Sequence, residues 1–168
     1  MMMRMKLTIL AILLFQLTTS VKGWSMSRPV QQAAKQFTFG DIIKFDRKKI
    51  GDIASYNHYA TYVGTDKQIP GKTDKQDIFH FSGEKKDKKN ANCVFAEMSN
   101  VKEESTPEVQ NYRDHNATKR TNEDMTTTII SLHNNCTNAY NIISANCEHL
   151  ATYIRYGSAS CRQVSLFL

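Results

Sequence analysis

The sequence contains no apolar run of comfortable length for a membrane span. Its longest run extends from Leu7 to about Leu17. The apolar residues at its end are fewer still: Val164, Leu166, Phe167 and Leu168. Because a helix needs roughly 20 apolar residues to cross a bilayer, we expect no spanning helix. An uncleaved N-terminal anchor that stretches to Val21 is the minor alternative.

Repeats and low-complexity tracts are also absent, and 168 residues suit one domain with a single core. The densest charge run, residues 85–89, has no interleaved aromatic residue. Proteins that bind single-stranded nucleic acid combine cations with aromatic side chains that stack on the bases. We therefore expect a solvated loop here, with a weak attraction to anionic lipid headgroups as the alternative, and no nucleic-acid partner.

The first 23 residues have the three-part pattern of a secretory signal peptide. Arg4 and Lys6 precede the apolar run, and the small residues Ser20 and Gly23 offer cleavage points. Removal of residues 1–23 lowers the formal net charge from +6 to +3, because it takes away three basic residues and no acidic one. The sequence thus predicts a signal peptide at 1–23, one domain at 24–168, and a secreted protein or one lumenal in the secretory pathway.

Two sequons and four cysteines bear on that compartment. Asn116 and Asn135 each begin an Asn-X-Thr sequon and are candidate glycosylation sites. The cysteines are Cys93, Cys136, Cys147 and Cys161. Four cysteines in an oxidising compartment would form two disulfides. If Cys147 is a catalytic thiol, one of the other three must also stay reduced or pair between chains, and the sequence leaves the pairing open.

The middle of the chain has the alternation and the turn signals of an antiparallel sheet. We expect strands at 42–45, 58–63, 76–81 and 93–98, joined by polar loops. In the second strand His58 shares a face with Ala60 and Tyr62, and in the third His80 shares a face with Ile78. With helices following the strands, the pattern predicts the α+β class, with an antiparallel sheet of about four strands.

Two amphipathic helices are expected after residue 126. The first is indicated by an apolar stripe with steps of three and four: Ile129, Leu132, Cys136, Ala139, Tyr140 and Ile143. The second begins at a cysteine and keeps one apolar face: Cys147, Leu150, Ala151 and Ile154. Asn146 can cap its first turn and Gly157 can end it. This cysteine helix is expected to pack on the sheet.

Cys147 has two interpretations. At the start of a helix, unpaired N–H groups and the helix dipole favour a thiolate, as a nucleophile requires. Alternatively, Cys147 is one more small buried apolar residue, because cysteines outside disulfides are among the most buried residue types and mostly inert.

The histidines help to separate these interpretations, because a thiol enzyme needs a base and a polar group that orients the base. His149 is turned about 200° from Cys147 around a helix, so we expect it to be structural. His133 would lie too far along a continuous helix. His58 and His80, on neighbouring strands, remain, and the sequence predicts a compact Cys-His-His set.

Four blocks resemble, in this order, the lecithin:retinol acyltransferase domain, and especially its HRAS-like suppressor branch of phospholipase A/acyltransferases. They are residues 39–43 (FGDII), 58–64 (HYATYVG), 78–81 (IFHF) and 146–157 (NCEHLATYIRYG). The resemblance covers roughly residues 37–164, and the last block is the specific one. It implies a permuted papain-like fold, shared with NlpC-type peptidases, in which the histidine strands precede a cysteine helix.

By this resemblance, Cys147 is the nucleophile, His58 the base and His80 the orienting group. The implied reaction cleaves a glycerophospholipid ester through an acyl-thioester on Cys147, with transfer to water, an amine or an alcohol. We expect the Cys147 N–H to stabilise the oxyanion, with the Tyr56 hydroxyl as a second candidate. The expected partner is a phospholipid membrane surface or lipid substrate, and no cofactor or metal is implied. The alternatives are an NlpC-type amidase or peptidase and a secreted binding module without turnover.

Overall fold

The computed structural model describes residues 37–47, 56–82, 91–136 and 146–162. They belong to one compact unit that spans residues 36–168. The predicted signal peptide and the lysine run at 85–89 lie outside the described residues. In the described part of the chain, no helix has both the length and the apolar character needed to cross a membrane.

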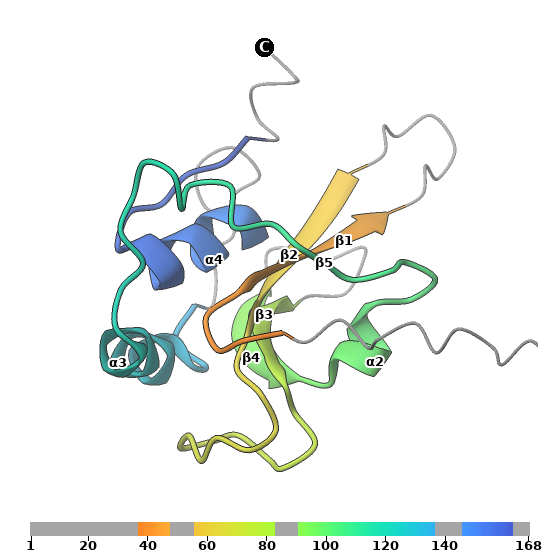
Figure 1. Cartoon of the computed structure of the whole chain (residues 1–168). Helices are drawn as coiled ribbons and strands as arrows, with labels where there is room; N and C mark the ends of the chain where they lie inside the picture. The colour runs from red at the N-terminus through yellow and green to blue at the C-terminus, as the bar shows by residue number, and fades with distance from the viewer. Residues whose placement is uncertain (1–36, 48–55, 83–90, 137–145, 163–168) are drawn as a thin grey trace, which may run out of the picture. The chain divides into compact units, whose positions relative to one another are not determined.

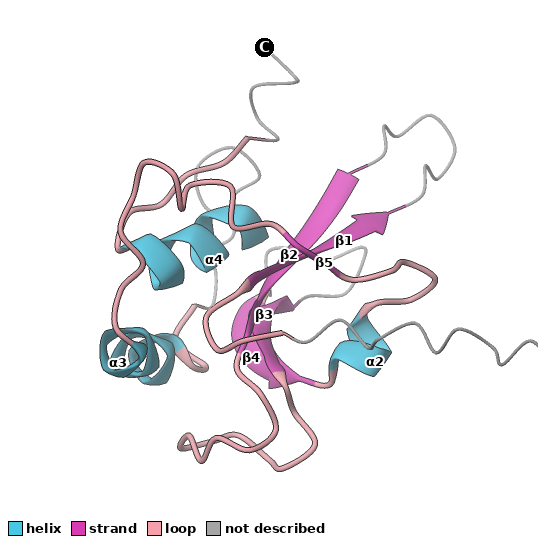
Figure 2. Cartoon of the chain, in the orientation of Figure 1, coloured by secondary structure: helices cyan, strands magenta, loops and turns pink. Residues whose placement is uncertain are grey.

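An antiparallel sheet forms the centre of this unit (Figures 1 and 2). Its strands are β1 (Ile42–Arg47), β2 (Tyr56–Tyr62), β3 (Ile78–Ser82), β4 (Asn92–Ala96) and β5 (Glu108–Val109), in the spatial order β4-β3-β2-β1-β5. The four predicted strands are confirmed as a meander. The prediction of about four strands is corrected to five, because β5, only two residues long, pairs with β1 inside a polar segment without alternation.

The β2–β3 ladder is much shorter than its neighbours. The β1–β2 register runs from Ile42↔Thr61 to Arg47↔Tyr56, whereas β2 and β3 pair only at Thr61↔Phe79 and Tyr62↔Ile78. β2 therefore extends beyond its paired region with β3, and the segment that carries His58 lies in this extension.

The two faces of the sheet carry separate apolar clusters. The first contains Ile42, Tyr59 and Phe79 and packs on α3 (Asn122–Leu132) and α4 (Cys147–Tyr156). The second contains Ile43, Phe45, Ala60, Ile78 and Met98, the last from the short helix α2 (Met98–Val101). In Figure 1, α3 and α4 lie on one side of the sheet and α2 on the other. Strand alternation therefore assigns α4 to one face and α2 to the other.

The cysteine helix α4 has the predicted boundaries. The Asn146 side chain accepts hydrogen bonds from the N–H groups of Glu148 (2.9 Å) and His149 (3.1 Å). Gly157 ends the helix in the left-handed region, with φ of 74°, and donates its N–H to the Tyr153 carbonyl (2.8 Å). Both caps satisfy backbone groups that a helix end otherwise leaves open.

The first predicted helix is shorter than its apolar stripe. α3 begins at Asn122, capped by Thr121, and ends at Leu132, so the continuation through Cys136 is wrong. Asn134 has a left-handed φ of 57°. The Cys136 N–H donates to the Asn92 side chain (2.9 Å) instead of continuing the helix. The remaining stripe positions, 139, 140 and 143, lie outside the described residues.

Cys136 lies outside the helix and belongs to a disulfide. Cys136 is bonded to Cys93 of β4, with 5.4 Å between the Cα atoms. Cys147 and Cys161 carry thiols. The sequence left the pairing of the cysteines open. The structure pairs Cys93 with Cys136, and Cys161 stays reduced alongside Cys147.

Candidate active site

Cys147 lies in the first turn of α4, on the side that packs against the sheet. Its side chain is 5% exposed. The thiol lies beside β2: Sγ is 4.0 Å from the Asn57 carbonyl oxygen and accepts a hydrogen bond from the Tyr59 N–H. The thiol therefore contacts the backbone on both sides of His58.

The expected thiolate is not the resting state of this site. Burial raises the pKa of Cys147 to about 11, and the Tyr59 N–H only partly offsets this. The Glu148 N–H at the helix N-terminus also lowers this pKa, although it is shared with the Asn146 side chain, and burial remains the larger effect. The expectation is corrected: at neutral pH Cys147 is a protonated thiol, which a base must deprotonate.

The two strand histidines are directly linked. His58 Nε2 and His80 Nδ1 are 2.9 Å apart, and the rings meet edge to face with centroids 5.1 Å apart. His58 also stacks on Phe45, its register partner in β1, at a centroid distance of 5.9 Å. The sequence prediction that His58 and His80 lie on adjacent strands is confirmed.

The environment of His80 keeps its ring neutral. Burial lowers the pKa of His80 to about 4, and the charge of Arg47 lowers it further. His80 is therefore neutral at pH 7. If its Nδ1 accepts the hydrogen bond, Nε2 of His58 carries the proton, and Nδ1 is the basic nitrogen of His58.

Arg47 is held in place on the histidine face of the sheet. Its guanidinium donates to the carbonyl oxygens of Lys102 (3.0 Å) and Val101 (2.5 Å) at the end of α2. It also lies 5.6 Å from the centre of the Phe45 ring. The sequence analysis did not identify Arg47, because only the packing of α2 brings its charge near His80.

The thiol and the histidine pair approach β2 from its two faces. Cys147 belongs to the first apolar cluster, whereas Phe45, on which His58 stacks, belongs to the second. The compact Cys-His-His set predicted from the sequence has the histidines on the face that the cysteine helix covers, and this is corrected, because His58 lies with Phe45 on the face opposite α4. The structure brings the three residues to the same part of β2, where its ladder with β3 has ended.

The two oxyanion candidates are positioned differently. The Cys147 N–H lies at the start of α4. The Asn146 side chain accepts hydrogen bonds from the next two N–H groups, those of Glu148 and His149, and not from this one. Tyr56 is at the outer end of β2, on the same face as His58, and is 37% exposed. The helix N–H is fixed by the backbone, whereas the tyrosine hydroxyl depends on a side-chain rotamer.

The other histidines have separate surroundings. His149 Nδ1 accepts a hydrogen bond from the Asn146 N–H (3.4 Å), so the expectation that His149 is structural is confirmed. His133 packs on the Phe95 ring at a centroid distance of 4.8 Å. His115 is exposed in the loop before α3. Within the four described ranges, no group of three His, Cys, Asp or Glu side chains could hold a metal ion.

Behind Cys147, a buried carboxylate connects the start of α4 to the segment after the helix. Glu148 is fully buried, and its carboxylate accepts hydrogen bonds from the Arg162 N–H (2.9 Å) and the Cys161 thiol (3.0 Å). The Asn146 amide donates to Cys161 Sγ (3.2 Å). The sequence analysis missed this cluster, since nothing in the sequence shows that residues 161 and 162 fold back on the helix.

The opposite end of α4 carries buried ion pairs. Arg155 donates to both carboxylate oxygens of Asp114 (3.0 and 2.7 Å), to the Gly40 carbonyl (2.8 Å) and to Asp41 (3.4 Å). Asp41 also accepts from Thr38 and Asn111. The Gly-Asp block and the Arg-Tyr-Gly block, noted in the sequence for resemblance alone, thus hold three parts of the chain together.

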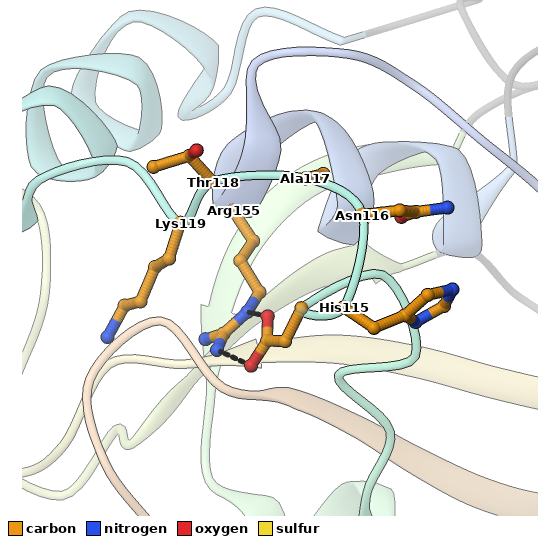
Figure 3. A pocket seen from close by; sticks show the side chains of 7 residues that line it. His115, Asn116, Ala117, Thr118, Lys119 and Arg155 are labelled. Atoms are coloured by element: carbon orange, nitrogen blue, oxygen red, sulfur yellow. Dashed lines mark hydrogen bonds and ion pairs between the residues drawn. The ribbon is translucent and has the colours of Figure 1, made fainter.

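An open pocket of about 620 Å³ lies at this end of α4. It is lined by Asp114, His115, Asn116, Ala117, Thr118, Lys119 and Arg155, and by neither Cys147 nor the histidine pair. In Figure 3, Lys119 and His115 point away from Arg155 on opposite sides. The two carboxylate bonds already occupy the Arg155 guanidinium, so this pocket is not the proposed reaction site.

Comparison with known proteins identifies the family. The model of the lecithin retinol acyltransferase family matches residues 35–160, well over half of the chain. A search of curated proteins found no match. The matched family is one of acyltransferase- and phospholipase-type thiol enzymes, and the five-stranded α+β architecture is compatible with its fold. The chain therefore belongs to the lecithin retinol acyltransferase family.

Proposed function

We propose that this protein is a thiol-dependent phospholipase A/acyltransferase of the HRAS-like suppressor branch, with a permuted papain-like fold. The observation that carries the proposal is the 2.9 Å contact between His58 and His80 beside the β2 segment whose backbone the Cys147 thiol contacts. The chain order supports the fold, because the histidine strands β2 and β3 precede the cysteine helix α4.

The first half-reaction acylates Cys147. The proton transfer takes place at the edge of β2 that its short ladder with β3 leaves open, where the Cys147 thiol lies. There Nδ1 of His58 reaches round the strand and takes the thiol proton, and Sγ attacks the carbonyl carbon of a glycerophospholipid ester. The Cys147 N–H, with Tyr56 as the second candidate, stabilises the oxyanion. When the carbon–oxygen bond breaks, His58 returns the proton to the leaving lysophospholipid alkoxide, and an acyl-thioester remains.

The second half-reaction releases the acyl group. A water molecule, or the amine or alcohol group of an acceptor lipid, loses a proton to His58 and attacks the thioester carbonyl. The carbon–sulfur bond breaks, and the sulfur recovers the proton from His58. In this mechanism Nδ1 of neutral His80 accepts a hydrogen bond from Nε2 of His58 throughout, so Nδ1 of His58 stays available for each transfer.

We further propose that the chain acts at a phospholipid surface in the secretory pathway or outside the cell. The Cys93–Cys136 disulfide supports an oxidising compartment. Asn116, in a turn, and Thr118 are both exposed, so Asn116 is the favoured glycan site. Asn135 is exposed, but its side chain donates to the Ser131 carbonyl (3.3 Å) and the next residue, Cys136, is in the disulfide.

The test is incubation of the purified protein with labelled phosphatidylcholine vesicles, with and without phosphatidylethanolamine as acceptor. We expect labelled fatty acid and lysolipid, with some acyl transfer when the acceptor is present. His58→Gln should stop both products, and the exposed His115→Gln is the matched control. Full turnover by His58→Gln would exclude the proposed base.

One observation favours a second candidate, a binding module without turnover. Burial raises the pKa of Cys147 to about 11, which is unfavourable for a nucleophile unless a base acts on it. Alkylation by iodoacetamide at pH 7 separates the two functions. A reactive enzyme labels Cys147 faster than Cys161, and His58→Gln slows this labelling. A binding module labels Cys147 more slowly, with no effect of His58→Gln.

A further inference from the structure

The segment that follows α4 is fixed against the first turns of the same helix. Thr152 Oγ1 donates to the Ser160 carbonyl (2.9 Å) and accepts from the Ser160 N–H (2.8 Å). Two residues later, the Arg162 N–H donates to the buried Glu148 carboxylate (2.9 Å). Cys161 lies between these two attachments, so its backbone is held beside the start of the helix.

The Cys161 thiol is hydrogen-bonded to both neighbours of Cys147 in the chain. Its Sγ accepts from the Asn146 amide (3.2 Å) and donates to the Glu148 carboxylate (3.0 Å). The hydrogen bond to the carboxylate keeps Cys161 a protonated thiol at rest, and both contacts fix its position beside the first turn of α4. Cys161 is also more exposed than Cys147, with an intermediate exposure against 5%.

We propose that Cys161 is a redox partner of Cys147, and that oxidation joins the two thiols in a disulfide that reversibly closes the active site. This rests on the proposed function for its effect on turnover, though the bond itself does not. The negative charge of a Cys161 thiolate raises the pKa of Cys147, which is consistent with two sulfurs in the same neighbourhood. A bridge would leave all four cysteines of the chain paired.

The chemistry requires an oxidant, for which a small disulfide such as glutathione disulfide is sufficient. Cys161, the more exposed of the two thiols, loses its proton to solvent and attacks one glutathione sulfur, and the other glutathione leaves as a thiolate that takes up a proton. Cys147 then attacks Cys161 Sγ, forms the protein disulfide and releases the second glutathione. One glutathione disulfide is reduced to two thiols, and two protein thiols are oxidised.

The existing contacts of Cys147 do not oppose this change strongly. Its bond to the Asn57 carbonyl is long, at 4.0 Å, and sulfur is a weak donor. Cys161 follows the exposed residues 157–159, where Gly157 has ended the helix. The bridge therefore requires movement of this short segment and of two side chains, and the sheet stays in place.

The test is oxidation of the full chain with glutathione disulfide, followed by alkylation and non-reducing peptide mapping. We expect two alkylatable thiols before oxidation, none after it, and a peptide that joins Cys147 to Cys161 with the mass of two hydrogens lost. Dithiothreitol should restore both thiols. Separate glutathione adducts on the two cysteines, or a bridge to Cys93 or Cys136 instead, would overturn the proposal.

Cys161→Ser is the discriminating variant, because its hydroxyl can still donate to Glu148. Turnover of the native chain should fall in proportion to the bridged fraction and return on reduction, while the oxidised variant keeps the activity of its reduced form. If neither protein hydrolyses phospholipid, the proposed function fails, yet the bridging peptide still decides the redox pairing. If turnover is present and unaffected by oxidation, the redox proposal fails alone.

Discussion

The two ends of α4 stabilise the same helix by opposite means. The thiol end, residues 146–149 with the β2 and β3 histidines, uses neutral hydrogen bonds and the buried Glu148 carboxylate. The anchor end, residues 155–157 with Asp41 and Asp114, uses charge pairs on Arg155. An ion pair fixes the position of its two side chains and also stabilises their charged forms, so neither side chain exchanges a proton near neutral pH. A site that transfers protons needs groups that are not fixed in one protonation state.

Cys147→Ser should give the largest difference between loss of turnover and loss of stability. This variant removes the nucleophile but keeps a small side chain that can donate to the Asn57 carbonyl. We expect phospholipid turnover to fall by at least about 10³-fold, while the free energy of unfolding changes by less than about 1 kcal/mol. Vesicle hydrolysis and urea unfolding measure the two effects. A large loss of stability would mean that the thiol end also holds the fold.

The reverse pattern is expected at the anchor end for Arg155→Met. The change leaves Asp41, which is 7% exposed, and Asp114 without their cation. Loss of one partner from a buried pair costs about 3–5 kcal/mol, and we expect the lower limit because Asp114 is half exposed. Urea unfolding measures this cost. Lys44→Met, which removes the ion pairs of Lys44 with the exposed Asp46 and Glu108, is the control and should cost less than about 1 kcal/mol.

The two ends should also lose stability in different pH windows. The pKa of His80 is lowered by burial from 6.5 to about 4, so the unfolded chain binds a proton before the folded one. Stability from this group is present above pH 6.5 and decreases by about 3 kcal/mol as the pH falls to 4. Hydrogen bonds from Arg155 lower the pKa of Asp114, so its contribution decreases only below pH 3.8.

Unfolding measured from pH 7 to pH 3 in the native chain and in His80→Gln tests these windows. The variant should lose most of the decrease between pH 6.5 and 4. A smaller slope should persist, because burial also lowers the pKa of His149. Asp114→Asn should change only the acidic window. An identical decrease in the native chain and His80→Gln would show that His80 does not titrate in this way.

The smallest expected effect concerns the helix cap. Asn146→Ala removes the acceptor of the Glu148 and His149 N–H groups and should cost about 1 kcal/mol of stability. It also removes the acceptor that shares the Glu148 N–H with the thiol, so the pKa of Cys147 should fall. The pH dependence of iodoacetamide labelling measures that shift. Asn146→Asp, which keeps the cap acceptor, should retain the stability.

The sequence predicted the elements that local chemistry determines. Alternation placed His58 and His80 on adjacent strands, and Asn146 and Gly157 bounded α4 correctly. Tertiary contacts determined the rest. The apolar stripe could not indicate that Cys136 leaves the helix for Cys93, since a disulfide partner distant in the chain has no local signal. The raised pKa of Cys147 also depends on burial by β2, which no residue spacing reports.

The contacts of Arg155 have a consequence for synthesis of the chain. Asp41 and Asp114 precede Arg155 by 114 and 41 positions, so both carboxylates leave the ribosome before their common cation. The strand meander can pair as it emerges, but α4 cannot be anchored until nearly all of the chain has been made. The Cys147 thiol thus reaches its place last, after the cysteines at 93 and 136 have had the opportunity to pair with each other.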